Sequence, residues 1–264
     1  MTDPRRPPCV LSIAGSDSGG GAGIQADLKA FARCGVHGMT AVTAITAQNT
    51  VGVTAVYALP PQTIVDQVAA VAADIGVDAV KIGMLGNAAT VDAVVGALEL
   101  LPGVPVVVDP VMVAESGSPL LDDDAQEALR TRLLPLATVV TPNLVEAAVL
   151  AGRESSPEVM ARAIRALGPE AIVVTGGHSQ TGSDLFFDGS QVVEIAGARH
   201  PDGAAHGSGC THSSALAAHL ARGADPLEAA RQAKEVAASA VRDGLRGVGA
   251  GPGPVNALGL LPPA

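Results

Sequence analysis

Two kinds of hydrophobic pattern alternate along the chain. Short runs of β-branched and other apolar residues, each closed by Gly, Pro, Asn or Asp, are typical of buried strands. They predict strands at residues 9–15, 40–48, 53–59, 79–83, 104–110, 138–142 and 171–177. Longer alanine-rich stretches between these runs predict helices at residues 22–34, 61–75, 89–101, 123–134, 144–151 and 157–167.

This alternation of strands and helices implies a mostly parallel sheet with helices on both faces. After residue 177 the pattern changes to two short strands, 185–188 and 191–195, which the turn Asp188-Gly189-Ser190 joins into a predicted hairpin. Helices at 208–222 and 226–245 finish the chain. Because no linker or shift in composition divides the sequence, we expect an α/β fold in a single domain over residues 1–264, with a disordered tail at residues 1–8.

Composition and charge narrow the class of protein. Hydrophobic residues make up 48% of the 264 residues and aromatic residues only 2%, so the core must consist of Ala, Val, Leu and Ile. The net charge is −10, whereas binding to nucleic acids or anionic membranes needs a clustered basic face. We therefore expect neither partner. The only lysines are Lys29, Lys81 and Lys234, so a bound polyphosphate needs backbone N–H groups, arginines or metal ions.

The cysteines and the chain start indicate the cellular compartment. Cys9, Cys34 and Cys210 are odd in number and widely spaced, without a CxxC pair, so neither a disulfide framework nor a zinc site is predicted. The first eight residues are polar and proline-rich, and no apolar run of 18 residues follows. We expect a cytoplasmic protein.

The most informative segment is the turn formed by Gly207, Ser208, Gly209 and Cys210, which opens directly into a predicted helix. Free backbone N–H groups at the positive end of a helix dipole hold an anion without a charged side chain. The alternative is an ordinary helix capped by Ser208. At this position Cys210 is either a buried small hydrophobic residue or a reactive thiol with a lowered pKa.

Polar residues also follow the predicted strands, where ligands of such sheets bind. The loop after the first strand contains Gly15, Asp17 and a run of glycines, which either lets a ligand approach the backbone or is a flexible connection. It lacks the GxGxxG pattern of a dinucleotide site. Gln48 matches the edge of an aminopyrimidine or stabilises a loop. By themselves, Asp27 indicates a solvated helix position and Met84 a core position.

Asp109 and Glu146 follow two further strands, each closed by a proline. Two carboxylates at one sheet edge suit Mg²⁺ held partly through water. Separately, Asp109 is typical of a turn and Glu146 of the first turn of a helix. Together with the anion-binding turn they favour metal-assisted phosphoryl transfer.

Seven segments of the chain appear in the order and spacing of a known family. They are AGSDSGGGAGIQADLKAF, TAQNTVGV, KIGMLG, VVDPVMVAESGSPLL, TPNLVEA, VVTGGH and HGSGCTHSSALAA. In these segments the chain resembles hydroxymethylpyrimidine/phosphomethylpyrimidine kinases, and the resemblance extends over roughly residues 10–255. The resemblance implies the ribokinase-like three-layer α/β/α fold.

The resemblance also implies ATP-dependent phosphorylation of 4-amino-5-hydroxymethyl-2-methylpyrimidine, and then of its monophosphate, in thiamine biosynthesis. Mg²⁺ is the implied cofactor, and a monovalent cation is a further candidate. The implied pyrimidine pocket is lined by Gly15, Asp27, Gln48 and Met84. The implied roles of the other residues are Mg²⁺ organisation for Asp109 and Glu146, the anion hole for Gly207, Ser208, Gly209 and Cys210, and the catalytic base for Cys210.

The chain departs from the family at positions where many members have lysine. Here these positions are Glu115, Thr175 and the neutral or acidic stretch 201–205. Either Arg199, His200 and a bound metal replace those cations, or the nucleotide or acceptor preference is altered. The alternative functions are a pyridoxal or pyridoxine kinase of the same fold and a weakly catalytic protein that senses pyrimidine. The predicted hairpin at 185–195 and relatives of the fold indicate a homodimer.

Overall fold

The computed structural model describes residues 6–114, 117, 120–176, 182–201 and 203–260. Its strands are β1 (Cys9–Ala14), β2 (His37–Val42), β3 (Ala44–Gln48), β4 (Val53–Ala58), β5 (Ala79–Ile82), β6 (Val106–Val108), β7 (Val139–Val140), β8 (Ala171–Val174), β9 (Asp184–Phe187) and β10 (Val192–Ile195). Its α-helices are α1 (Gly23–Arg33), α2 (Pro61–Asp74), α3 (Ala88–Leu98), α4 (Asp123–Ala128), α5 (Leu144–Ala151), α6 (Pro157–Arg165), α7 (Ser208–Ala221) and α8 (Pro226–Arg242).

An eight-stranded sheet organises the molecule, in the order β10-β9-β8-β7-β6-β5-β1-β2. Neighbouring strands from β2 to β8 are parallel, and β9 and β10 continue the sheet in antiparallel pairing. All residues of β1 and β5 are buried, as expected for parallel strands covered on both faces. Because parallel strands end at the same edge, the loops that follow β1, β5 and β6 meet there.

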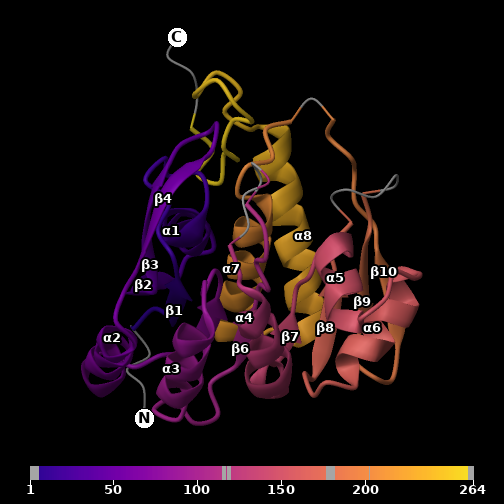
Figure 1. Cartoon of the computed structure of the whole chain (residues 1–264). Helices are drawn as coiled ribbons and strands as arrows, with labels where there is room; N and C mark the ends of the chain where they lie inside the picture. Colours follow the sequence, from indigo (N-terminus) through magenta and orange to yellow (C-terminus); the bar gives the residue numbers. More distant parts are fainter. Residues whose placement is uncertain (1–5, 115–116, 118–119, 177–181, 202, 261–264) are drawn as a thin grey trace.

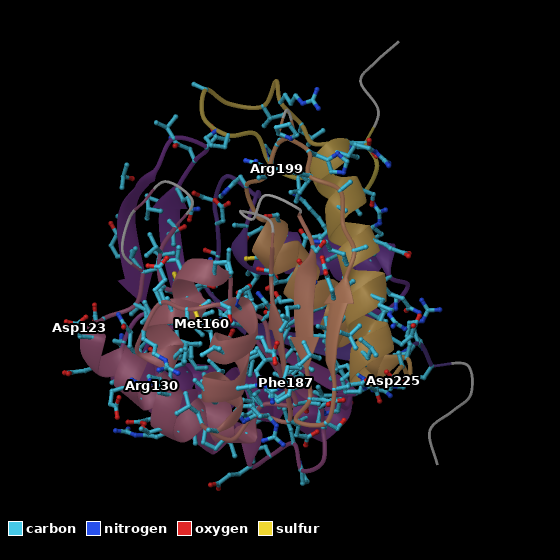
Figure 2. The ribbon with its side chains drawn as sticks, turned by 90° about the vertical axis from the view of Figure 1, so that its right-hand side faces the viewer. Asp123, Arg130, Met160, Phe187, Arg199 and Asp225 are labelled. Carbon is cyan, nitrogen blue, oxygen red and sulfur yellow. The ribbon has the colours of Figure 1, made fainter. Side chains whose placement is uncertain are left out.

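Helices cover both faces of this sheet (Figure 1). On one face the apolar side chains of α2 to α6 pack against the strands in one core, which includes Met160 of α6 and Phe187 of β9 (Figure 2). On the other face a second core contains Phe31 of α1 and the alanines of α7 and α8. This arrangement confirms the predicted α/β/α layers.

The strand predicted over residues 40–48 is two strands in two sheets. The chain leaves the large sheet at residues 42–43, where the N–H of Val42 donates to Oε1 of Gln67 (2.9 Å) and the hydroxyl of Thr43 donates to the carbonyl of Met84 (2.8 Å). The next residues form β3, which pairs with β4 in a separate antiparallel sheet. The separate hairpin is therefore β3–β4, whereas the predicted hairpin at 185–195 extends the large sheet.

Two chain segments also differ from their predictions. The helix predicted at 123–134 is α only to Ala128, followed by a π-helical turn (Leu129–Leu133) and a 3-10 turn (Leu134–Leu136), because Pro135 cannot continue an α-helix. In the expected N-terminal tail, Arg6 pairs with Asp78 (Nη1 to Oδ2, 3.1 Å), while residues 1–5 lie outside the described part. Within the described residues, no helix is long and apolar enough to cross a membrane.

Candidate active site

A pocket of about 130 Å³ lies at the carboxyl ends of β1, β5 and β6, beside the start of α7. Since a cavity of roughly 150 Å³ accommodates one benzene-sized ring, this volume suits a single small heteroaromatic ring. Of the residues predicted for the site, those that line the pocket are Gly15, Gln48, Met84, Asp109, Gly207, Ser208, Gly209 and Cys210. Two others, Asp27 and Glu146, do not line it.

The start of α7 forms an anion-binding turn at one side of the pocket. Gly207 is the N-cap residue, with a left-handed backbone (φ 84°) and no side-chain cap hydrogen bond. The alternative of a helix capped by Ser208 is therefore wrong. Among the described residues, no acceptor bonds the N–H groups of Gly209 and Cys210, which stand at the positive end of the helix dipole. These two groups can receive the oxygen atoms of a phosphoryl group.

Close backbone contact holds this turn against the glycine-rich loop after β1. A Cβ atom on Gly207 would lie 1.8 Å from the carbonyl oxygen of Gly21. A Cβ atom on Gly15 would likewise lie 2.4 Å from Cε of Met84. Glycine is required at 207 both by this contact and by its positive φ.

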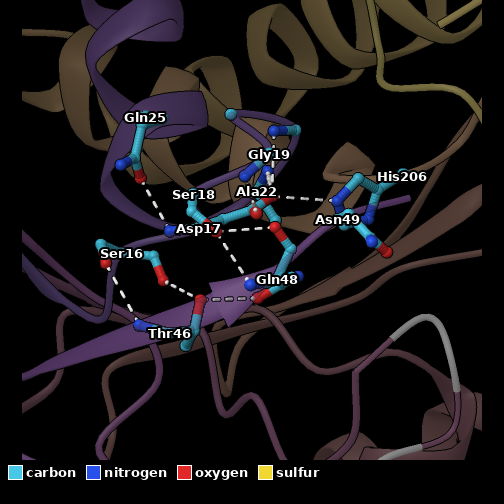
Figure 3. Close-up of polar contacts among 12 residues, drawn as sticks. Ser16, Asp17, Ser18, Gly19, Ala22, Gln25, Thr46, Gln48, Asn49 and His206 are labelled. Atoms are coloured by element: carbon cyan, nitrogen blue, oxygen red, sulfur yellow. Dashed lines mark hydrogen bonds and ion pairs between the residues drawn. The ribbon is translucent and has the colours of Figure 1, made fainter. Parts of the chain in front are cut away.

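The carboxamide of Gln48 also lines the pocket. Its Oε1 accepts a hydrogen bond from the hydroxyl of Thr46 (3.1 Å), and its backbone N–H donates to Oγ of Ser18 (2.8 Å) (Figure 3). The bond from Thr46 orients the carboxamide, whereas the bond to Ser18 holds the backbone of Gln48. The amide can therefore offer a defined donor and acceptor to a bound ring.

A buried ionic cluster lies at the base of the pocket. Nζ of Lys81 lies 3.0 Å from Oδ1 of Asp27 and 3.8 Å from Oδ2 of Asp109, and both Lys81 and Asp27 are completely buried. Hydroxyl groups donate to the carboxylates from Ser12 (2.5 Å, to Asp27), Ser214 (2.7 Å, to Asp27) and Ser213 (3.0 Å, to Asp109). Burial favours the neutral amine, but the carboxylates of Asp27 and Asp109, Asp27 most strongly, outweigh it and hold the pKa of Lys81 above its ordinary value.

Asp27 therefore stands in a different place from the one that the sequence indicates. As an isolated helix residue it is expected in solvent, and by resemblance it is expected in the pyrimidine pocket. In the structure it lies behind the pocket wall and has Lys81, Ser12 and Ser214 as partners. Its contacts are those of a charge that orients Lys81.

The prediction of a lowered pKa for Cys210 is wrong. Burial of the thiol raises its pKa to about 12; the charge of Lys81 and the N–H of Gly23 lower it, while Asp109 and Asp27 raise it. The helix dipole was expected to stabilise the thiolate, but desolvation and the two carboxylates outweigh it. At neutral pH the resting site holds a protonated thiol.

Asp109 and Glu146 make up the candidate metal centre. The side chain of Glu146 closes a capping box with Asn143, accepting its N–H at 3.0 Å. Burial and the charge of Asp109 raise the pKa of Glu146 to about 8, although the N–H groups of Asn143 and Met112 favour the carboxylate. In the described part of the chain, no cluster of three or more His, Cys, Asp or Glu could hold a metal ion. A cation here would need further oxygen ligands from phosphate or water.

Among the polar residues that line the pocket, Lys81 and His206 were not identified as site residues from the sequence, and Asp17 was identified only as a member of the glycine-rich loop. Lys81 lies within the buried strand β5, in the sequence Asp78-Ala79-Val80-Lys81-Ile82. A lysine inside an otherwise apolar strand could have indicated a buried carboxylate partner, because an unpaired ammonium is strongly unfavourable inside a sheet. His206 directly precedes the anion-binding turn, and nothing in its spacing indicates a partner.

The lysines offer no free cation to a nucleotide. Lys81 pairs with Asp27, Nζ of Lys29 donates to the carbonyl of Gly20 (2.6 Å), and Nζ of Lys234 pairs with Asp184 (2.6 Å). Two of the positions where many family members have lysine are Thr175 and Glu115. The backbone N–H of Thr175 donates to the carbonyl of Pro142 (2.8 Å), and Glu115 lies outside the described residues.

The two proposed replacement cations are not part of the pocket lining. Neither Arg199 nor His200 belongs to the residues that line it. Arg199 lies at the opposite end of α8 from Asp225, the N-cap residue of that helix (Figure 2).

The layered parallel sheet and the anion-binding helix terminus define the class: a small-molecule kinase of the ribokinase-like fold. The family profile described as phosphomethylpyrimidine kinase matches residues 17–256. The chain belongs to this family.

Individual relatives agree with this assignment. The chain is 50% identical over 256 residues to the hydroxymethylpyrimidine/phosphomethylpyrimidine kinase of Rhizobium meliloti (strain 1021), covering 94% of this chain and 96% of the relative. It resembles the pyridoxal kinase of Staphylococcus aureus in complex with AMP-PCP and pyridoxal (TM-score 0.86, 36% identity, 96% and 94% of the two chains). It also resembles the phosphomethylpyrimidine kinase of Clostridium difficile 630 (TM-score 0.76, 40% identity, 86% and 96%). The predicted fold and kinase class are confirmed.

The buried cluster predicts a large loss of stability for Lys81→Met. Removing the ammonium leaves Asp27 and Asp109 without their cationic partner, which lowers the free energy of unfolding by about 3–5 kcal/mol. Urea unfolding followed by circular dichroism measures this change. The matched control is Arg132→Met, whose exposed side chain pairs only with exposed Asp92 and is expected to contribute less than about 1 kcal/mol. Equal stability of the two variants would contradict the role given to Lys81.

The raised pKa predicts that Cys210 reacts slowly with iodoacetamide. At pH 7.5 its thiol is protonated, so its alkylation is expected to be at least about tenfold slower than that of free cysteine, because the thiolate is the reactive form. The rate should keep rising with pH up to the region of the pKa. Peptide mapping by mass spectrometry separates Cys210 from Cys9 and Cys34. Labelling as fast as that of free cysteine would show a thiolate at neutral pH.

Proposed function

We propose that this protein transfers the γ-phosphoryl group of ATP to the hydroxymethyl group of 4-amino-5-hydroxymethyl-2-methylpyrimidine and then to the resulting monophosphate, in thiamine biosynthesis. One observation carries the proposal: the same pocket is lined by an anion-binding helix terminus and by the carboxamide of Gln48, whose Oε1 accepts a hydrogen bond from Thr46. The names of the curated relatives support both substrates.

The backbone supplies the main contribution to transfer. The N–H groups of Gly209 and Cys210 would bind oxygens of the transferring group, where charge is distributed in a loose transition state. Cys210 is the proposed base position for the acceptor proton. Cys210 could accept that proton only as the thiolate, whose charge Lys81 favours; in a loose transition state the acceptor hydroxyl need not lose its proton before the phosphoryl group moves.

Asp109 and Glu146 fit Mg²⁺ as the predicted cofactor. Carboxylate oxygens are the ligands that this ion prefers, and both side chains are buried, so a bound cation would offset the cost of burying their charges. When bound, Mg²⁺ neutralises charge on the phosphates. A monovalent cation, a homodimer and a cytoplasmic location remain predictions from the sequence.

The direct test is an assay of the purified protein with ATP and Mg²⁺ on three acceptors: the pyrimidine, its monophosphate and pyridoxal. We expect phosphorylation of both pyrimidines with a higher kcat/KM than pyridoxal. Pyridoxal is the competing acceptor because the similar structure from Staphylococcus aureus is a complex with pyridoxal. A preference for pyridoxal would reverse the assignment, and pyrimidine binding without turnover would support the sensor.

Gln48→Leu should separate the two kinds of acceptor. The substitution leaves polar edge atoms of the pyrimidine unpaired and should lower kcat/KM for the pyrimidine by about 1–3 kcal/mol, or roughly 5- to 150-fold. Pyridoxal should lose less. Gln62→Leu, on an exposed turn of α2, is the matched control and should leave both values unchanged. A greater loss with pyridoxal would contradict the pyrimidine assignment.

Because the lysines are paired within the protein, we expect the initial rate of phosphorylation to depend steeply on the Mg²⁺ concentration. ATP carries about four negative charges, which bound metal must neutralise where cationic side chains are few. If Thr175 faces phosphate, Thr175→Lys should lower KM for ATP and reduce the Mg²⁺ dependence of the initial rate. Thr131→Lys, which adds the same charge at an exposed site, is the control. Overlapping Mg²⁺ titrations of the wild type and Thr175→Lys would place the donor phosphates elsewhere.

A further inference from the structure

Asp17 and His206 meet in the pocket wall although they are 189 positions apart in sequence. Asp17 belongs to the loop between β1 and α1, and His206 directly precedes the anion-binding turn. Nε2 of His206 lies 3.0 Å from Oδ2 of Asp17 (Figure 3), and their side chains are 9% and 1% exposed. The roles in acceptor binding, metal binding and proton transfer described above do not involve this pair.

Asp17 is the centre of the glycine-rich loop. Its Oδ1 accepts the N–H of Gly19 (2.8 Å), and its Oδ2 accepts those of Gly21 (2.9 Å) and Ala22 (2.8 Å). Burial opposes its charge, but these hydrogen bonds and His206 hold the pKa of Asp17 below its ordinary value. Because an ionised carboxylate only accepts hydrogen bonds, Nε2 of His206 must carry the hydrogen and donate it.

His206 is also fixed through its backbone. Its N–H donates to the carbonyl of Gly253 (3.3 Å), and its carbonyl accepts the N–H of Val255 (3.0 Å). The C-terminal segment thus holds the main chain of His206, while Asp17 holds its side chain. The residue that follows is Gly207, whose left-handed conformation starts the anion-binding turn.

No space remains between the two segments that this pair connects. A Cβ atom on Gly21 would lie 2.1 Å from Cδ2 of His206, and one on Gly207 would lie 1.8 Å from the carbonyl oxygen of Gly21. A shift of the imidazole therefore moves the glycine-rich loop, which contributes to the acceptor pocket, relative to the turn that receives the phosphoryl group.

We propose that Asp17 and His206 act as a positioning pair, which holds the anion-binding turn in alignment with the acceptor loop during phosphoryl transfer. The inference rests on the proposed function, because it assumes that an acceptor in this pocket receives a phosphoryl group. Misplacement of reacting groups by about 1 Å lowers a rate by roughly 10²-fold. The pair acts on kcat, whereas binding of the ring depends on other lining residues such as Gln48 and Met84.

Four variants test the pair: His206→Ala, His206→Gln, Asp17→Asn and the double variant Asp17→Asn/His206→Ala. kcat and KM are measured with ATP and the pyrimidine, and the Kd of the pyrimidine is measured by calorimetry. His206→Ala should lower kcat at least about tenfold and change the Kd less than about twofold. His206→Gln, whose amide N–H₂ can donate to Asp17, should recover at least about threefold in kcat.

The double variant should be no more than about twofold slower than the slower single variant, because both substitutions break the same contact. The matched control is His37→Ala, an exposed histidine at the start of β2, which should retain the wild-type kcat. If Asp17→Asn does not fold, the kcat of His206→Gln compared with that of His206→Ala tests the proposal by itself.

Three results would overturn the proposal: equal kcat for His206→Gln and His206→Ala, losses that multiply in the double variant, or a Kd that weakens in proportion to kcat. The last result would assign the pair to acceptor binding. A wild-type protein that phosphorylates pyridoxal but not the pyrimidine contradicts the proposed function alone. The same variants measured with pyridoxal then still test the pair.

Discussion

The buried ion pair between Lys81 and Asp27 is the interaction on which the fold and the site both depend. It joins β5 to α1, and Ser12 and Ser214 connect it to β1 and α7. Because an isolated buried charge is strongly unfavourable, these elements are stable only in their mutual arrangement. The same ammonium also lies near Asp109, at the base of the pocket, so the ion pair links the packing of the layers to the electrostatics of Cys210.

Small side chains make the close approach at the pocket possible. The buried residues that α7 and α8 contribute to the second core are almost all alanines, which let these helices pack close to the sheet and to each other. At the N-terminus of α7 the contact is closer still, because Gly207 has no side chain and lies against the backbone of Gly21. A composition with 48% hydrophobic and only 2% aromatic residues thus suits a site in which backbone groups, rather than long side chains, surround the ligand.

The ammonium groups of the three lysines all have partners within the protein, and the net charge is −10. A polyphosphate therefore meets backbone N–H groups and carboxylates in the described pocket, with Lys81 held by its own partner. Because the lysines are engaged within the protein and the family's usual lysine positions hold other residues, we expect metal ions to neutralise the charge of the nucleotide.

The order of most strands and helices, the parallel sheet and the turn at 207–210 could be predicted from the amino-acid sequence, because hydrophobic period and glycine placement are local properties. The departure of β3 from the large sheet, the position of Asp27 behind the pocket and the raised pKa of Cys210 could not be predicted in this way. Nor could the contact between Asp17 and His206. In each case the deciding partner is distant in sequence, at separations of 54 positions for Lys81 and Asp27 and 189 for Asp17 and His206. Burial and charge pairing depend on these distant neighbours, and a pattern along the chain does not contain them.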